Sequence, residues 1–144
     1  MKRAATGIVA AVLAMSATAA LAQSKPPLKL GGITIPHDRG ALGHSDGDTL
    51  LHAIADALLG AAGLGDIGQW FPDTDVRYRG ISSAKLIQKV LKEIRQHGLK
   101  PVHVDTIIHL ERPKLGKYRA RIRRNVARLL SLQIQHVNIK AKTG

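Results

Sequence analysis

The chain has 144 residues, with 22 Lys and Arg against 10 Asp and Glu, a formal net charge of +12, and no cysteine. This length allows one domain of ordinary size. The lack of cysteine excludes a disulfide framework, a thiol nucleophile and a thiolate metal site, so a bound metal would need histidine and carboxylate ligands. One Trp, two Tyr and one Phe leave few side chains on which nucleic-acid bases could stack.

The charge is divided along the chain. Residues 23–76 carry 3 basic and 7 acidic side chains, whereas residues 77–144 carry 17 basic and 3 acidic ones. An acidic middle followed by a basic half suggests two different working surfaces.

Residues 1–22 have the pattern of a secretory leader. Met1-Lys2-Arg3 precedes the Ala-rich apolar run 4–14, and Ala20-Leu21-Ala22 provides a small-x-small cleavage sequence. A transmembrane helix is the weaker reading, because the run is short and interrupted by Ser and Thr. We therefore expect cleavage after Ala22, export to the periplasm, a linker over 23–27 and the folded domain over 28–144.

The rest of the chain predicts alternating strands and helices. Alternation around Gly31-Gly32 indicates a hairpin, and Val102 to Leu110 alternates like a strand. In chain order we expect a hairpin over 28–35, a helix capped by Ser45 and ending near Gly60, a loop over 60–80, a helix from Ser82 or Ser83 to Gly98, a strand over 102–110, a helix over 115–132 and a strand over 137–141. This order predicts an α+β fold with helices layered on one sheet.

The acidic middle contains a candidate metal site. His44, Ser45, Asp48, His52 and Asp56 fall within thirteen positions, and Asp48, His52 and Asp56 recur at the spacing of one helix face. Histidine and carboxylate ligands one turn apart can converge on a metal ion. A solvated helix face is the alternative.

A second candidate is the loop that contains Gly65-Asp66-Ile67-Gly68 and Phe71-Pro72-Asp73-Thr74-Asp75. Such loops place backbone amides around a polar ligand, and a carboxylate such as that of Asp66 can accept hydrogen bonds from ribose hydroxyls. Ordinary turn chemistry is the alternative, because Gly, Asp and Pro are also the common turn residues.

The third candidate is the basic helix. Lys117, Arg121, Arg124 and Arg128 share one face, opposite an apolar stripe. Such a helix could bind nucleic acid or an anionic membrane. A solvated outer face is the alternative.

Together these motifs identify a family. The segments GGITIP (31–36), HSDGD (44–48), GDIG (65–68), FPDTD (71–75) and NIKAKT (138–143), in this order, closely resemble the 2-C-methyl-D-erythritol 2,4-cyclodiphosphate synthases. The resemblance implies a homotrimer of α+β subunits, each with helices on one face of a mixed sheet, and active sites between adjacent subunits. It also implies cyclisation of a CDP-linked methylerythritol 2-phosphate with release of CMP, in the cytoplasm or a plastid.

The resemblance also implies roles for individual residues. His52 would be a ligand of a catalytic zinc ion, with magnesium or manganese as a second metal, and His44 and Thr143 would stabilise the transferring phosphoryl group. Substrate would be bound by Ser45, Asp66, Ile67, Gly68, Phe71, Pro72, Asp73, Thr74, Asp75, Pro113 and Lys114, with Asp66 to Gly68 at the ribose and Pro113 and Lys114 beside the cytidine.

Two features of the family pattern are not found. Thr18-Ala19-Ala20 aligns with an Asp-x-His pair that supplies two zinc ligands, and the Glu that binds the second metal would follow Thr143. We therefore expect weak zinc binding and impaired catalysis, since catalytic zinc normally has three protein ligands. The alternative is a non-catalytic remnant that binds cytidine nucleotides or other anions.

Overall fold

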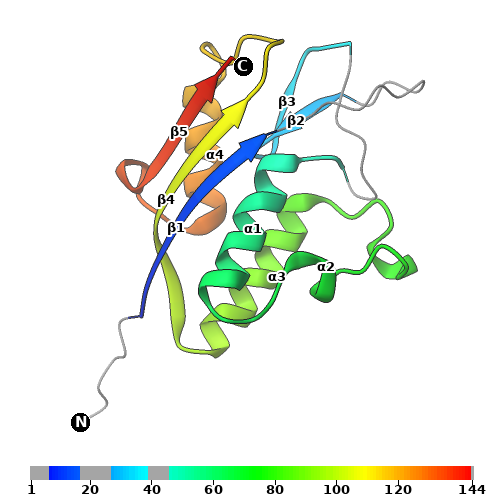
Figure 1. Cartoon of the computed structure of the whole chain (residues 1–144), viewed down its shortest axis with the longest axis vertical. Coiled ribbons are helices and arrows are strands. Elements are labelled where there is room, and N and C mark those ends of the chain that lie inside the picture. The colour runs from blue at the N-terminus through cyan, green and yellow to red at the C-terminus, as the bar shows by residue number, and fades with distance from the viewer. Residues whose placement is uncertain (1–6, 17–26, 39–45, 144) are drawn as a thin grey trace.

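The computed structural model describes the backbone of residues 7–16, 27–38 and 46–143, and side chains from residue 27 onward. The longer helices cover one side of a sheet (Figure 1). α1 (Thr49–Ala61) packs on the first strand and on α3 (Ser83–Gln96), and α4 (Arg119–Leu130) packs on the last strand. The shorter helical segments are α2 (Ile67–Trp70) and the 3-10 turns Val76–Tyr78 and Ile134–His136.

The strands form two sheets. β1 (Gly7–Ser16), β4 (Leu99–His109) and β5 (Val137–Lys142) make a parallel sheet with β4 in the centre. β2 (Leu28–Leu30) and β3 (Ile33–Ile35) make a separate antiparallel hairpin. The predicted α+β class is confirmed, but the expected single mixed sheet is divided into a parallel and an antiparallel part. Residues 7–16, which we assigned to the leader, form β1 beside β4.

The hairpin turn follows the prediction. Gly31 and Gly32 have φ of 62° and 77°, the left-handed conformation that two-residue hairpin turns require. A Cβ on Gly31 would also lie 2.8 Å from Cγ2 of Ile122. Glycine therefore serves both the turn and the close packing of the hairpin against α4.

The first helix begins differently from the prediction. Its N-cap is Asp48 rather than Ser45, and Oδ1 of Asp48 accepts a hydrogen bond from the Leu51 amide at 3.0 Å. The Asp48 carboxylate is fully buried and also accepts from the amides of Gly31 at 2.9 Å and Gly32 at 2.5 Å. The spacing predicted that Asp48, His52 and Asp56 share one helix face, but Asp48 is the buried N-cap and does not lie on a solvated face with the other two. It ties α1 to the hairpin.

Asp46 joins the starts of two helices. Its carboxylate accepts hydrogen bonds from the backbone amide of Ser83 at 3.1 Å, from the Ser83 hydroxyl and from the Asp48 amide at 3.2 Å. Burial by itself raises the pKa of Asp46, but these bonds and the Lys29 ammonium at 3.9 Å hold that pKa below its usual value. The charged form of Asp46 therefore stabilises the junction of α1 and α3.

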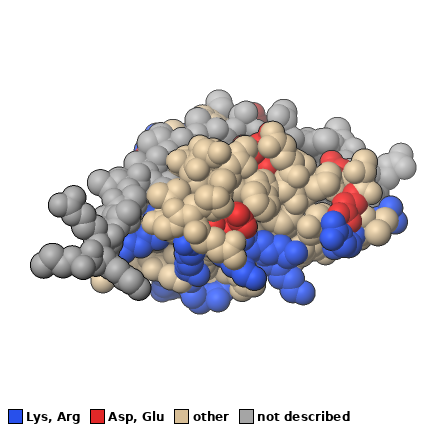
Figure 2. Space-filling model, turned by 90° about the horizontal axis from the view of Figure 1, so that it is seen from below, with Lys and Arg blue, Asp and Glu red and all other residues tan. Residues whose placement is uncertain are grey.

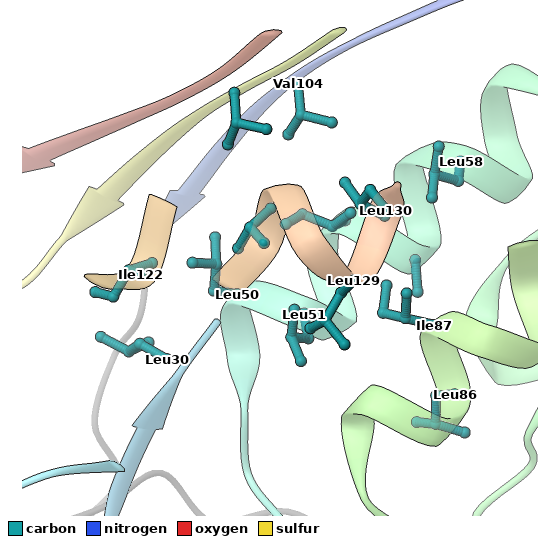
Figure 3. Packing of buried hydrophobic residues seen from close by; sticks show 14 of the residues in the cluster. Leu30, Leu50, Leu51, Leu58, Leu86, Ile87, Val104, Ile122, Leu129 and Leu130 are labelled. Atoms are coloured by element: carbon teal, nitrogen blue, oxygen red, sulfur yellow. The ribbon is translucent and has the colours of Figure 1, made fainter. Parts of the chain in front are cut away.

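The core is aliphatic and joins all the layers. Figure 3 shows Leu30 of the hairpin, Leu50 of α1 and Ile122 of α4 gathered together, with Ile87 of α3 further along. The apolar stripe of α4 is buried in this core: Ile122, Val126, Ala127, Leu129 and Leu130. Its packing against the sheet accounts for the amphipathic pattern of this helix. None of the described helices has the length and apolar character of a membrane span.

Asp48→Ala is expected to lower the free energy of unfolding by about 2 to 4 kcal/mol, because it removes the N-cap and leaves the buried Gly31 amide without its acceptor. Denaturant unfolding at one fixed protein concentration measures the change. Asp56→Ala is the matched control, since its exposed carboxylate accepts one amide hydrogen bond, from Ile67 at 3.0 Å. The control should cost less than about 1 kcal/mol; equal losses would contradict the role of Asp48.

Asp46→Asn is expected to destabilise the protein at neutral pH and to matter less in acid. A carboxyl with a lowered folded pKa contributes stability above its unfolded pKa, and this contribution disappears as the pH falls through the folded pKa. The difference in unfolding free energy between parent and variant should therefore shrink below about pH 4. The exposed Asp38→Asn is the control; a difference for Asp46→Asn that stays constant from pH 7 to pH 3 would refute the assignment.

Candidate functional site

A pocket of about 230 Å³ lies where α1, α2 and α3 meet the loop after α2. It brings together seven residues that the sequence assigned to the site: His52, Ile67, Gly68, Phe71, Pro72, Asp73 and Asp75. Four further residues complete its lining: Tyr78, Arg79, Ile81 and Leu86. His52 of α1 and the two loop motifs therefore border one pocket.

The loop before the pocket is held by two aspartates. Asp66 caps α2, with its Oδ1 accepting from the Gln69 amide at 2.9 Å, and Asp56 of α1 accepts from the Ile67 amide at 3.0 Å. Gly65 has φ of 82°, and a Cβ there would collide with the side chain of Gln69. Asp66 is exposed at the rim and does not itself line the pocket.

The loop after α2 folds back through aromatic and charged contacts. Phe71 packs edge-on against Tyr78, with ring centroids 5.1 Å apart. Asp75 caps the turn 76–78 and pairs with Arg77 at 2.6 Å, and the hydrogen bonds from Arg77 lower the pKa of Asp75. These contacts shape the wall that carries Asp73 and Asp75.

Sequence reasoning missed Tyr78 and Arg79 as lining residues. A signal was present, because three of the four aromatic side chains of the chain, Trp70, Phe71 and Tyr78, fall within nine positions. Two of these three, Phe71 and Tyr78, line the pocket.

His52 projects into the pocket from α1 and is half-buried. Burial lowers its pKa, and the negative charges of Asp48, Asp46 and Asp73 only partly oppose this effect. The imidazole is therefore neutral at neutral pH, which is the form that binds a metal ion. Among the residues that the structure describes, however, no group of three His, Asp or Glu side chains could hold one.

The remaining predicted residues are separate from the pocket. Pro113 and Lys114 follow the carboxyl end of β4, and Thr143 follows that of β5. The two ends lie together, since the Leu110 amide donates to the Lys142 carbonyl at 2.9 Å. None of these three residues lines the pocket, nor does the exposed Thr74. His44 and Ser45 lie outside the described residues.

The chain is similar to a group of named enzymes. The model of the YgbB family matches residues 14–144. The 2-C-methyl-D-erythritol 2,4-cyclodiphosphate synthase of Bordetella pertussis (strain Tohama I) is 53% identical over 118 residues, which cover 82% of this chain and 73% of that protein. The synthase of Syntrophobacter fumaroxidans is 51% identical over 117 residues, or 81% of this chain and 74% of that protein.

Solved structures agree with the sequence matches. A 2-C-methyl-D-erythritol 2,4-cyclodiphosphate synthase in a CDP-bound form superposes with a TM-score of 0.78 at 42% identity, covering 82% of this chain and 79% of that one. Another structure of such a synthase gives a TM-score of 0.79 at 44% identity, covering 83% and 79%. The chain therefore belongs to the YgbB family, the family of the cyclodiphosphate synthases that its motifs resemble.

Proposed function

We propose that this protein acts on a CDP-linked methylerythritol 2-phosphate as a cyclodiphosphate synthase. In the proposed reaction an oxygen of the 2-phosphate bonds to the β-phosphorus, the bond from that phosphorus to the bridging oxygen breaks, and CMP leaves. The observation that carries the proposal is the pocket itself, which joins His52 to the GDIG and FPDTD loops. The CDP-bound form of a structural relative supports the nucleotide half.

The pocket offers different partners to different parts of this substrate. The Asp66 carboxylate at the rim suits paired ribose hydroxyls, since a charged carboxylate that is held in place as an N-cap accepts strong hydrogen bonds. Asp73 would repel a phosphate and suits hydroxyl groups of the sugar alcohol. Arg79 is the cation of the pocket lining, so we assign it to the phosphates.

We further propose that the working site forms between subunits of a homotrimer. In one chain Pro113, Lys114 and Thr143 lie at the carboxyl end of the sheet, and the pocket lies beside α2. Two separate groups of predicted site residues are what a site shared between adjacent subunits would require. A trimer would place the sheet-end group of one subunit against the pocket of the next.

The described residues do not fit the expected zinc site. His52 has a suitable neutral imidazole, but no group of three His, Asp or Glu side chains in the described part of the chain could hold a metal ion, and Thr18-Ala19-Ala20 offers no ligand where the family pattern has two. We therefore propose that the chain still binds a cytidine nucleotide but catalyses the cyclisation slowly. The alternative function, a cytidine-nucleotide binder without catalysis, follows from the same observation.

The compartment is linked to the fold. An exported location rests on the pattern of residues 1–22 alone. Cleavage after Ala22 would also remove β1, which borders the central strand β4. A chain that is cleaved after Ala22 therefore cannot contain the three-stranded parallel sheet. The leader stays a prediction.

Asp66→Asn is expected to weaken CMP binding about ten- to hundredfold, because a charged hydrogen-bond partner of the ribose is lost. Asn is as good an N-cap as Asp, so α2 should persist. Titration calorimetry with CMP and CDP measures the effect, with the exposed Asp38→Asn as the control. No nucleotide binding to the folded parent protein, or equal binding by all three proteins, would defeat the nucleotide proposal.

The parent chain is expected to release CMP from the CDP-linked substrate about a hundredfold more slowly than the double variant Thr18→Asp/Ala20→His, because a poorly held metal cannot position the reacting phosphate. CMP release and zinc content per subunit are measured together, in zinc and magnesium. Adding His52→Ala to the double variant should abolish both gains. Rapid zinc-dependent release by the parent, abolished by His52→Ala, would show that other residues complete the metal site.

A further inference from the structure

The outer face of α4 carries charge that the proposed reaction does not use. Lysine and arginine side chains line one edge of the protein in the view of Figure 2. α4 contains five arginines and no acidic residue. Its apolar stripe is buried in the core, so the helix has no free apolar face with which to enter a membrane. The basic face is what remains available.

Part of this face forms a shallow, open groove. A hollow of about 260 Å³ lies between α4 and the hairpin strand β3. It is lined by Ile33, Arg121, Arg124, Asn125 and Arg128, and shares no residue with the pocket that contains His52. Three guanidinium groups therefore border one shallow groove.

Asn125 organises the groove. Its Oδ1 accepts from Nε of Arg128 at 3.1 Å and from a terminal nitrogen of the same guanidinium at 2.8 Å. Its Nδ2 donates to the Gly31 carbonyl at 2.6 Å, and a Cβ on Gly32 would lie 2.4 Å from that nitrogen. The absence of a side chain at Gly32 thus leaves room for Asn125, and Asn125 in turn holds the Arg128 guanidinium. A guanidinium held in advance loses less freedom when an anion binds.

The other two arginines differ from Arg128 and Arg123 in their contacts. Within the described residues, no carboxylate forms an ion pair with Arg121 or Arg124. Arg123, by contrast, turns away and donates to the Val137 carbonyl at 2.6 Å. Like charges close together on one helix face destabilise it slightly, and an anion between them would relieve the repulsion.

We propose that this groove binds a compact phosphate-bearing anion, a phosphomonoester or a diphosphate, at a site separate from the catalytic pocket. Planar guanidinium groups match phosphate oxygens in geometry and charge. The lining contains no aromatic side chain on which a base could stack, so a compact anion is favoured over single-stranded nucleic acid.

Inorganic pyrophosphate is the probe, titrated calorimetrically into the whole protein with saturating CMP present to fill the catalytic pocket. Arg121→Gln/Arg124→Gln should weaken binding about tenfold or more, since charged hydrogen bonds are lost. Lys92→Gln/Arg95→Gln removes the same charge from the exposed side of α3 and should change affinity less than about twofold at 0.15 M salt, because distant charges are screened. Arg128→Lys, which keeps the charge but loses the fork to Asn125, should weaken binding as well.

Further probes distinguish the source of the phosphate. Vesicles of phosphatidylglycerol test a lipid headgroup, and a single-stranded oligonucleotide tests nucleic acid. Selective loss of vesicle binding in Arg121→Gln/Arg124→Gln would identify the headgroup as the source and support the groove. Pyrophosphate affinities that are equal in the two double variants, or an oligonucleotide that binds more tightly than pyrophosphate and is weakened equally by both, would overturn the proposal.

Discussion

The buried carboxylate of Asp48 is the contact on which the arrangement of both sites depends. It caps α1 and accepts the amides of Gly31 and Gly32, while Asn125 of α4 donates to the Gly31 carbonyl from the other side. The hairpin turn is thus fixed between two helices. His52 lies about one helical turn after Asp48 in α1. Arg128 lies less than one helical turn after Asn125 in α4. The pocket and the groove are therefore positioned from the same two glycines.

The strongly periodic elements could be predicted from the sequence, and the exceptions have physical causes. The hairpin, α1, α3, β4 and β5 follow their patterns because each has one face in the core. β1 was missed because an Ala-rich apolar run fits a leader and a strand equally well, and only its pairing with β4 distinguishes them. Asp48 was misjudged because its partners at Gly31 and Gly32 are sixteen or more positions away, beyond any local pattern.

The motifs indicated the residues that line the pocket better than the composition did. Gly, Asp and Pro in the loops were equally consistent with ordinary turns, and several of these aspartates do cap turns: Asp66 caps α2 and Asp75 caps the segment after it. Asp75 thus both builds the loop and lines the pocket, whereas Asp66 builds the loop beside it. What the sequence could not supply is that the segments containing Pro113 and Thr143 begin side by side at one end of the sheet, because this follows from the parallel pairing of β4 with β5.

The structure separates the acidic and the basic side chains of the chain by what they contact. The acidic residues of the middle segment are largely committed to backbone amides, as at Asp46, Asp48, Asp56 and Asp66, so they hold the pocket together and repel an incoming phosphate less than their number suggests. The basic half remains mostly exposed on the outer face of α4 and elsewhere. A surface with this surplus of positive charge attracts anions over a distance of several ångströms, within the screening length of about 8 Å at physiological salt. A phosphate-bearing ligand therefore meets an attractive field first, and the hydrogen-bonding geometry of the pocket or the groove then decides where it is held.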